Sequence, residues 1–314
     1  MKLITTKLIT VALAGIILPL AAAFSPFIRW VDCAVSYDAL KKVYDVCRKN
    51  RGTEAEFDFA DGIAYVATRN GNKFSRKDSK YINDMKENAA SGNVAGKYAD
   101  NKYYKYHKEA YGAILENFVG DYEIAETGEK GFGITAYFPI ASGHWYNHYD
   151  DFGNSRSFGF KRKHLGHDIM GGVGTPIVAV EGGTVTELGW NRYGGWRVGI
   201  TSLDGKRYYY YAHLRKGKPY ADGLTKGARV EAGEVVGFLG ATGYSDKEDV
   251  NLKNCVPHLH FGMQLIFDES QRDGNGEIWI DVYALCKFVS ANRAKTVKDE
   301  NGAVKSVNLR RKIS

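Results

Sequence analysis

The sequence predicts an α+β chain in which an α-helical region precedes a larger, mainly β part. Residues 36 to about 118 carry apolar side chains at helical spacing, whereas short β-rich runs broken by glycines continue from 131 to about 280. Short, evenly spaced strands with few helices are typical of an antiparallel sandwich or a partly open barrel. The 314 residues suffice for one large or two ordinary domains. We expect four parts: an N-terminal segment (1–23), a helical region (24–130), a mainly β domain (131–290) and a polar basic tail (291–314).

The first 24 residues have the pattern of an export signal. Lys2 and Lys7 precede an apolar run, residues 8–24, that ends in three alanines and a phenylalanine. A basic start, an apolar stretch and a small-residue site are typical of a secretory signal peptide, and the length also suits an uncleaved membrane anchor. In either case the lysines stay inside and the rest of the chain is exported. We expect a protein that is secreted into the cell wall or anchored on the outer face of the cytoplasmic membrane.

The charge of the chain favours an anionic partner. The formal net charge is +7, and a basic protein attracts nucleic acid, a membrane surface or an anionic cell-wall polymer. The sequence has no long arginine-rich run and no recognisable nucleic-acid motif, which argues against nucleic acid. An exported chain meets wall polymers instead.

The helical region is expected to contain four helices. Ser36 can cap the first, and Thr53 with Glu56 forms a capping-box pattern for the second, which Gly71 ends. His107 lies on a Tyr-rich fourth helix, where we interpret it as a helix-surface or packing residue rather than a ligand. We interpret this bundle as a spacer or cover. The expected ranges are 37–47, 54–70, 76–91 and 97–119.

The mainly β domain should contain hairpins and one closing helix. Glycines at 182–183 and 205 lie in turns that suit hairpins. The expected helix covers 281–289, and the tail after it is expected to be a solvated extension. The strand signals lie at 134–140, 176–180, 183–188, 197–202, 207–212 and 235–239.

Four cysteines occur without a CxxC pair, and an exported chain can form disulfides but need not. Cys255 lies three residues before His258, which is weak evidence for a zinc ligand without further cysteines. We expect structural cysteines, buried or paired: Cys33, Cys47, Cys255 and Cys286.

The candidate metal-binding residues of the sequence are histidines and one aspartate. Side chains at i and i+2 of a strand share a face, so His258 and His260 should project together. In an extended segment His164 and Asp168 also share a face, while His167 points away and is expected to be exposed. With His260 they supply two imidazoles and a carboxylate. That set suits Zn²⁺, which in catalytic sites keeps one position open for water.

A third element is the tyrosine-rich strand at 207–212. Strand parity predicts that His213 shares a face with Tyr209 and Tyr211, at the end of the strand where a site can form. We therefore expect these two tyrosines to wall a substrate groove. His144 and His148 have the spacing of a metal pair, but they lack carboxylate or cysteine neighbours, so we expect them to line or flank the same groove.

These motifs together resemble the lysostaphin-type (LytM-like) zinc endopeptidases of peptidoglycan. That family has an H-x-G-x-D motif, a Tyr-Ala-His step and an H-x-H motif, which here are residues 164–168, 211–213 and 258–260. Segments 174–177, 230–235 and 240–243 also look like the family, and the resemblance covers about 131–290. Residues 150–153 and 208–216 look similar to a clostridia-like subgroup.

The resemblance implies a duplicated hybrid β motif and a zinc-dependent endopeptidase that hydrolyses peptide cross-links of peptidoglycan with a metal-activated water. By this resemblance one zinc ion is held by His164, Asp168 and His260, and His213 and His258 act on the reaction. We expect His258 to take the proton of the water and His213 to donate a hydrogen bond to the oxyanion, with the reverse assignment left open.

Two other functions remain as alternatives. The first is a non-catalytic module of the same fold that binds the wall or a partner. The second is a lipoyl-type carrier, because residues 179–183 and 230–234 resemble halves of such domains, although no modifiable lysine lies in the turn between matched strands. The sequence also leaves open whether the helical region blocks the site, and whether Asn154 or another upstream residue fills the open metal position.

Overall fold

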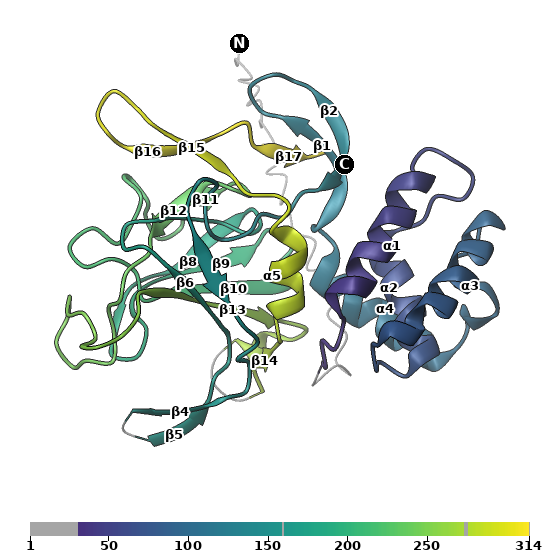
Figure 1. Ribbon diagram of the computed structural model, residues 1–314, viewed down its shortest axis with the longest axis horizontal. Coiled ribbons are helices and arrows are strands. Elements are labelled where there is room, and N and C mark those ends of the chain that lie inside the picture. Colours follow the sequence, from purple (N-terminus) through teal and green to yellow (C-terminus); the bar gives the residue numbers. More distant parts are fainter. Residues whose placement is uncertain (1–30, 159, 273–275, 314) are drawn as a thin grey trace, which may run out of the picture.

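The computed structural model describes residues 31–158, 160–272 and 276–313. The expected signal or anchor segment, with its apolar run at 8–24, lies outside the described residues. Within them, no helix combines the length and apolarity that crossing a bilayer requires. The helices α1 to α4 group on one side of a larger β-rich body, and the helix α5 (Tyr283–Val289) lies between that body and α1 (Figure 1). The predicted α+β class, with a mainly β part after a helical region, is confirmed.

Four α-helices form the helical region, and their ends follow local capping. The Ser36 side chain accepts from the Ala39 amide, as predicted, and Gly71 ends the second helix with φ 65°. The predicted capping box at Thr53 is wrong, because Asp58 caps the second helix instead. The helices are α1 (Tyr37–Asn50), α2 (Phe59–Asn70), α3 (Ser79–Ala90) and α4 (Lys102–Leu115), with short 3-10 turns at Arg76–Asp78 and Gly96–Tyr98.

The helix α2 is the centre of this bundle. It packs against α1, α3 and α4, and eight of its residues, from Phe59 to Ala67, are buried. His107 of α4 is buried too, with Nδ1 3.0 Å from the Thr68 hydroxyl. A satisfied, buried imidazole is a packing residue, as predicted.

An eight-stranded antiparallel sheet dominates the β-rich body. Its order is β11-β8-β9-β10-β13-β6-β3, and β14 pairs with β13. A separate two-stranded sheet, β7 with β12, packs into the same core. The strands are β3 (Tyr146–His148), β6 (His167–Gly171), β7 (Pro176–Val178), β8 (Gly183–Asn191), β9 (Gly195–Ser202), β10 (Arg207–Ala212), β11 (Arg229–Val230), β12 (Val235–Phe238), β13 (His258–Leu265) and β14 (Ile278–Trp279).

A hairpin of β4 (Ser155–Phe158) and β5 (Phe160–Lys163) extends from this body (Figure 1). Residues 134–140, predicted as one strand, are not a strand in full. Ile134 ends β2, and Ile140 forms an isolated bridge with Ile177. The segment is apolar because it is buried, not because it pairs along its length.

The predicted solvated tail is wrong, and so is the purely helical region before residue 130. β1 (Val119–Ile124) pairs with both β2 (Lys130–Ile134) and β17 (Arg310–Lys312), while β15 (Lys295–Lys298) and β16 (Val304–Val307) form a hairpin. Leu309 is buried in a small cluster with Tyr137. The basic side chains of β17 give no strand signal in the sequence. Its backbone nevertheless pairs with β1, nearly two hundred residues earlier in the chain.

A buried ion-pair network joins the helical region to the sheet. Arg207 of β10 is fully buried, and its Nε and Nη2 donate to the two carboxylate oxygens of Glu181 at 2.7 and 2.9 Å. Nη2 also contacts Asp204 at 2.9 Å, and Nη1 donates to the Ala113 carbonyl of α4 at 2.7 Å. The Tyr209 hydroxyl donates to the same Glu181. Every polar group of this network therefore has a partner.

Candidate metal centre

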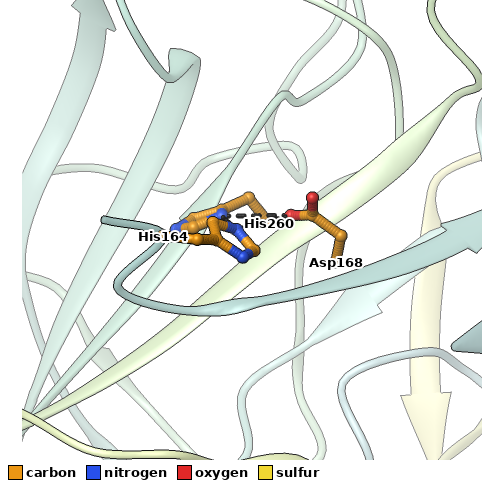
Figure 2. Close-up of side chains that lie close together, drawn as sticks. All are labelled: His164, Asp168 and His260. Carbon is orange, nitrogen blue, oxygen red and sulfur yellow. Dashed lines mark hydrogen bonds and ion pairs between the residues drawn. The ribbon is translucent and has the colours of Figure 1, made fainter. Parts of the chain in front are cut away.

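Two neighbouring strands and one loop bring three metal-binding side chains together (Figure 2). Asp168 of β6 pairs directly with His260 of β13, so their side chains share one face of the sheet. His164 lies in the short loop between β5 and β6. Gly166 between them passes under the His260 ring, where a Cβ atom would lie 2.6 Å from Cε1. This close approach explains the glycine of the H-x-G-x-D motif.

The three donor atoms form a nearly equilateral triangle. Nε2 of His164 and Nδ1 of His260 are 2.8 Å apart, and they lie 3.0 and 3.1 Å from Oδ1 of Asp168. Each donor atom lies about 1.7 Å from the centre of the triangle, which is less than the roughly 2.0–2.2 Å length of a bond from zinc to N or O. One ion can therefore reach all three donors. Among the described residues, no other group of three such side chains comes this close.

A second layer of polar groups surrounds these donors. Nδ1 of His164 is 3.1 Å from the Asp151 carbonyl and 3.2 Å from its carboxylate. Nη2 of Arg156 lies 2.8 Å from Oδ2 of Asp168 and 3.0 Å from Oδ2 of Asp151. Asn154 is exposed, and its carbonyl accepts from the His164 amide. Sequence reasoning did not single out the contacts of Asp151 and Arg156 with these donors, because only the folded chain brings the residues together.

His213 and His258 lie beside the donor triangle. Their ring centroids are 4.8 Å apart, and the His213 ring is 6.0 Å from that of His260. Nδ1 of His213 faces the Thr242 carbonyl at 2.7 Å, and Nδ1 of His258 faces the Val256 carbonyl at 2.8 Å. A carbonyl oxygen can only accept, so both Nδ1 atoms carry hydrogen. In the neutral rings, Nε2 is then the acceptor.

The predicted groove tyrosines are the wrong pair. Tyr209 and Tyr211 are fully buried on the far face of β10, where the Tyr211 hydroxyl accepts from a backbone amide at 2.9 Å. The alternation itself was right, but His213 does not continue it. His213 has φ 60°, a left-handed conformation that turns its side chain to the opposite face from the one parity predicts. Tyr208 and Tyr210 therefore lie on the side of the site.

A groove of about 570 Å³ runs from the donor triangle across the sheet. His164, His213 and His260 line one end of it, and Tyr210 lies next to His260 with ring centroids 5.8 Å apart. Trp279 makes edge contacts with the ring of Tyr210. The charged lining residues are Arg156, Arg162, Lys163, Arg197, Arg272, Glu187 and Glu277. The groove lining therefore combines aromatic rings with more basic than acidic side chains.

Three other histidines differ from expectation. His167, expected to be exposed, is buried, with Nδ1 3.2 Å from the Asp151 carboxylate and Nε2 2.8 Å from Nδ1 of His148. The groove lining among the described residues includes neither His148 nor His144, so neither lines the groove, and the expectation that they flank it stays a prediction. The carbonyl of His144 accepts from Arg293. His148 and His167 instead form a polar chain behind the site that ends on Asp151.

Burial and charge set the protonation of the site. Burial and the neighbouring imidazoles lower the pKa of His213 to about 3. Burial opposes ionisation of Asp168, but hydrogen bonds with His164 and His260 hold its pKa well below its usual range. Burial also acts to lower the pKa of His164, yet nearby carboxylates raise it to about 9. A metal ion and a proton therefore compete for Nε2 of His164.

Three of the cysteines are buried thiols, in agreement with the prediction of structural cysteines that are buried or paired: Cys33, Cys47 and Cys286. Cys255 is half-buried, with Sγ 3.7 Å from Nδ1 of His258. All four are free thiols in the described part of the chain. None of them belongs to the donor triangle.

Part of the chain is similar to known peptidases. The model of Peptidase family M23 matches residues 162–273. The chain is 38% identical over 126 residues to an L-Ala–D-Glu endopeptidase of Bacillus subtilis, which covers 40% of this chain and 37% of that protein. It is 38% identical over 99 residues to the glycyl-glycine endopeptidase ALE-1 of Staphylococcus capitis, covering 31% of this chain and 24% of that protein. The chain thus spans between about a quarter and little more than a third of the length of these relatives.

A solved structure supports the fold of nearly the whole chain. It is described as a candidate glycyl-glycine endopeptidase lytM from Ruminococcus gnavus, with a TM-score of 0.58 and 24% identity over 88% of this chain and 95% of that chain. At this identity the likeness concerns the fold alone. The motif resemblance to lysostaphin-type endopeptidases is confirmed, because residues 162–273 match the model of Peptidase family M23 and the relatives above are named as endopeptidases.

Proposed function

We propose that this chain is a zinc-dependent endopeptidase that hydrolyses peptide bonds in bacterial peptidoglycan. The observation that carries the proposal is the triangle of His164, Asp168 and His260 at the end of a groove, with two further histidines beside it. Relatives named for cleaving L-Ala–D-Glu and glycyl-glycine bonds support the choice of substrate. A bond to D-Glu belongs to wall peptides rather than to ordinary proteins, which are built from L-amino acids and glycine.

The donor set supports zinc as the metal. Two imidazole nitrogens and one carboxylate oxygen are ligands of catalytic zinc sites, which use three protein ligands. Bound there, zinc would lower the pKa of a water towards 7 and polarise the scissile carbonyl. The residues that would hold it are His164, Asp168 and His260. The groove would align an extended peptide beside them.

His258 and His213 would move protons. Nε2 of His258 lies 3.8 Å from Oδ1 of Asp168, close enough to the donors to accept the proton of an attacking water. A neutral His213 has no hydrogen on Nε2, because its Nδ1 donates to Thr242. The expected oxyanion donor role therefore suits His213 poorly. We propose that both rings are acceptors, and that either can carry the proton to the leaving amine.

The test separates metal binding from proton transfer. We expect His260→Ala to lose both zinc and the release of peptides from purified walls, because it removes one of the three ligands. His258→Ala should retain zinc and lose about 10²–10⁴-fold in activity, the usual contribution of a general acid–base group. His144→Ala, outside the groove lining, is the matched control and should retain both. Zinc is measured in the purified protein, and mass spectrometry of the new peptide ends identifies the bond cleaved.

Full wall hydrolysis by His260→Ala would overturn the proposal. A wild-type protein that holds zinc and binds walls without releasing peptides would favour the alternative, a wall-binding module of the same fold. The wild-type chain must therefore be assayed for binding and for cleavage in the same experiment.

We further propose that the protein acts outside the cytoplasmic membrane, with residues 8–24 as signal or anchor. The net charge of +7 suits anionic wall polymers as additional partners. Fractionation of cells that produce the chain should place it in the wall, the medium or the outer membrane face. Recovery in the cytoplasm alone would contradict this location.

A further inference from the structure

Asp151 connects the donor triangle to the protein behind it. It lies between β3 and β4, and its side chain is 1% exposed. Its carboxylate lies 3.2 Å from Nδ1 of His164 and 3.2 Å from Nδ1 of His167, and it also accepts from the Asp168 amide at 3.3 Å. One buried carboxylate thus holds the loop that carries one ligand and the strand that carries another.

The contacts of Asp151 determine which nitrogen of His164 is free. Both oxygens that face Nδ1, the carbonyl and the carboxylate of Asp151, can only accept. Nη2 of Arg156 also lies 3.2 Å from Nδ1, but its two hydrogens face the nearer carboxylates of Asp168 and Asp151. Nδ1 therefore carries the hydrogen of the neutral ring, and the lone pair is on Nε2, the atom at the corner of the triangle. His167 is held in the same way, and its Nε2 can accept from His148.

Arg156 acts on the other oxygen of the ligand carboxylate. Its Nη2 lies 2.8 Å from Oδ2 of Asp168, while Oδ1 of Asp168 faces His164 and His260. The guanidinium is anchored in turn by Asp151 at 3.0 Å. Since Oδ2 is occupied by a charge-assisted hydrogen bond, one oxygen of Asp168 is left for a metal.

We propose that Asp151 and Arg156 are positioning residues of the metal centre: Asp151 orients His164 with Nε2 as the donor, and Arg156 restricts Asp168 to binding through Oδ1 alone. This inference rests on the proposed function only in so far as the triangle binds a metal. Residues that hydrogen-bond metal ligands typically contribute 10–100-fold to affinity. The β4–β5 hairpin, which carries Arg156, is thereby a part of the site.

The experiment measures metal binding directly. Metal affinity is determined by competition with a chromophoric chelator, and the Co²⁺-loaded protein gives an absorption spectrum that reports coordination. We expect Arg156→Met to weaken metal binding 10–100-fold, because Asp168 is no longer held in place. The variant should also lower the Co²⁺ absorption, because Asp168 becomes free to bind through both oxygens and raises the coordination number. Arg156→Lys, which keeps the charge, should recover part of the affinity. Asp151→Asn should also weaken binding 10–100-fold.

Matched controls exclude a general loss of stability. Arg69→Met removes an ion pair of the helical region, Arg69 with Asp84 at 2.8 Å, and should leave affinity and spectrum unchanged. Asp78→Asn is the control for Asp151→Asn, because Asp78 is also a buried aspartate, 3% exposed, and lies far from the metal centre in sequence. If the Arg156 and Asp151 variants melt earlier but bind metal with wild-type affinity and spectrum, the two residues are structural and the inference is wrong. Weakened metal binding in a protein whose wild type cleaves no wall would uphold the inference and refute the proposed activity.

Discussion

Replacing Arg207 by methionine tests the network that joins the helices to the sheet. The guanidinium is fully buried, with two bonds to Glu181, one to Asp204 and one to the Ala113 carbonyl. Methionine fills much of the volume but donates nothing. Glu181 would keep its bond from the Tyr209 hydroxyl and would lose its counter-charge.

The expected loss is about 3–5 kcal/mol in the free energy of unfolding, the usual effect of breaking a buried ion pair from one side. Most of it should come from the uncompensated carboxylate of Glu181. The double variant Arg207→Met/Glu181→Gln removes that charge, so it should be more stable than the sum of the single losses by about 2–3 kcal/mol.

The assay is urea unfolding followed by circular dichroism and tryptophan fluorescence. Arg311→Met is the matched control, because its pair with Glu231 is about half exposed and should contribute at most about 1 kcal/mol. An Arg207→Met protein within 1 kcal/mol of wild type would refute the reasoning, and so would a double variant whose loss equals the sum of the single losses. Either result would mean that the buried network stabilises the fold much less than its contacts indicate.

Two further predictions concern the tyrosines and the helical region. Tyr210→Phe, in the groove lining, should lower wall cleavage and change the unfolding free energy by less than about 1 kcal/mol. Tyr211→Phe should lower the unfolding free energy by about 1–3 kcal/mol, because a buried amide loses its acceptor, and should leave the activity of the folded enzyme unchanged. The opposite pattern in paired activity and urea measurements would restore the parity prediction. Burial lowers the pKa of His107, so the unfolded chain binds the proton more readily than the folded one. The stability that this neutral imidazole contributes is therefore present above about pH 6.5 and declines as the pH falls below that value. Melting curves from pH 8 to 5 should therefore fall less steeply for His107→Leu than for wild type, and parallel slopes would contradict the assignment.

Strand periodicity, motif spacing and the resemblance to a known family together predicted the three side chains of the donor triangle. A period of two places His258 and His260 on one face, and the H-x-G-x-D spacing brings His164 and Asp168 within reach of them. Each spacing is local, whereas the contact of Asp168 with His260 needs β6 to pair with β13 across 92 residues. Strand parity is the local part of this prediction. The same rule failed at His213, because a single left-handed residue reverses which face its side chain takes.

Contacts between distant segments were beyond such rules. The basic residues 310–312 resemble a solvated tail until β1, far earlier in the chain, supplies backbone partners. His167 resembles an exposed histidine until Asp151 and His148 provide its two hydrogen bonds in the interior. Burial of a polar group depends on partners, and only the folded chain shows which partners are available.

The sequence by itself therefore determined the α+β class, because that class depends on spacing along the chain. Its motifs and their family resemblance named the three side chains that the fold brings together in the donor triangle. The tertiary structure decided which tyrosines line the groove and which nitrogen of His164 is free. It also decided that Arg156 occupies the second oxygen of Asp168. These depend on how side chains meet across strands and loops, and no periodicity of the chain specifies such meetings.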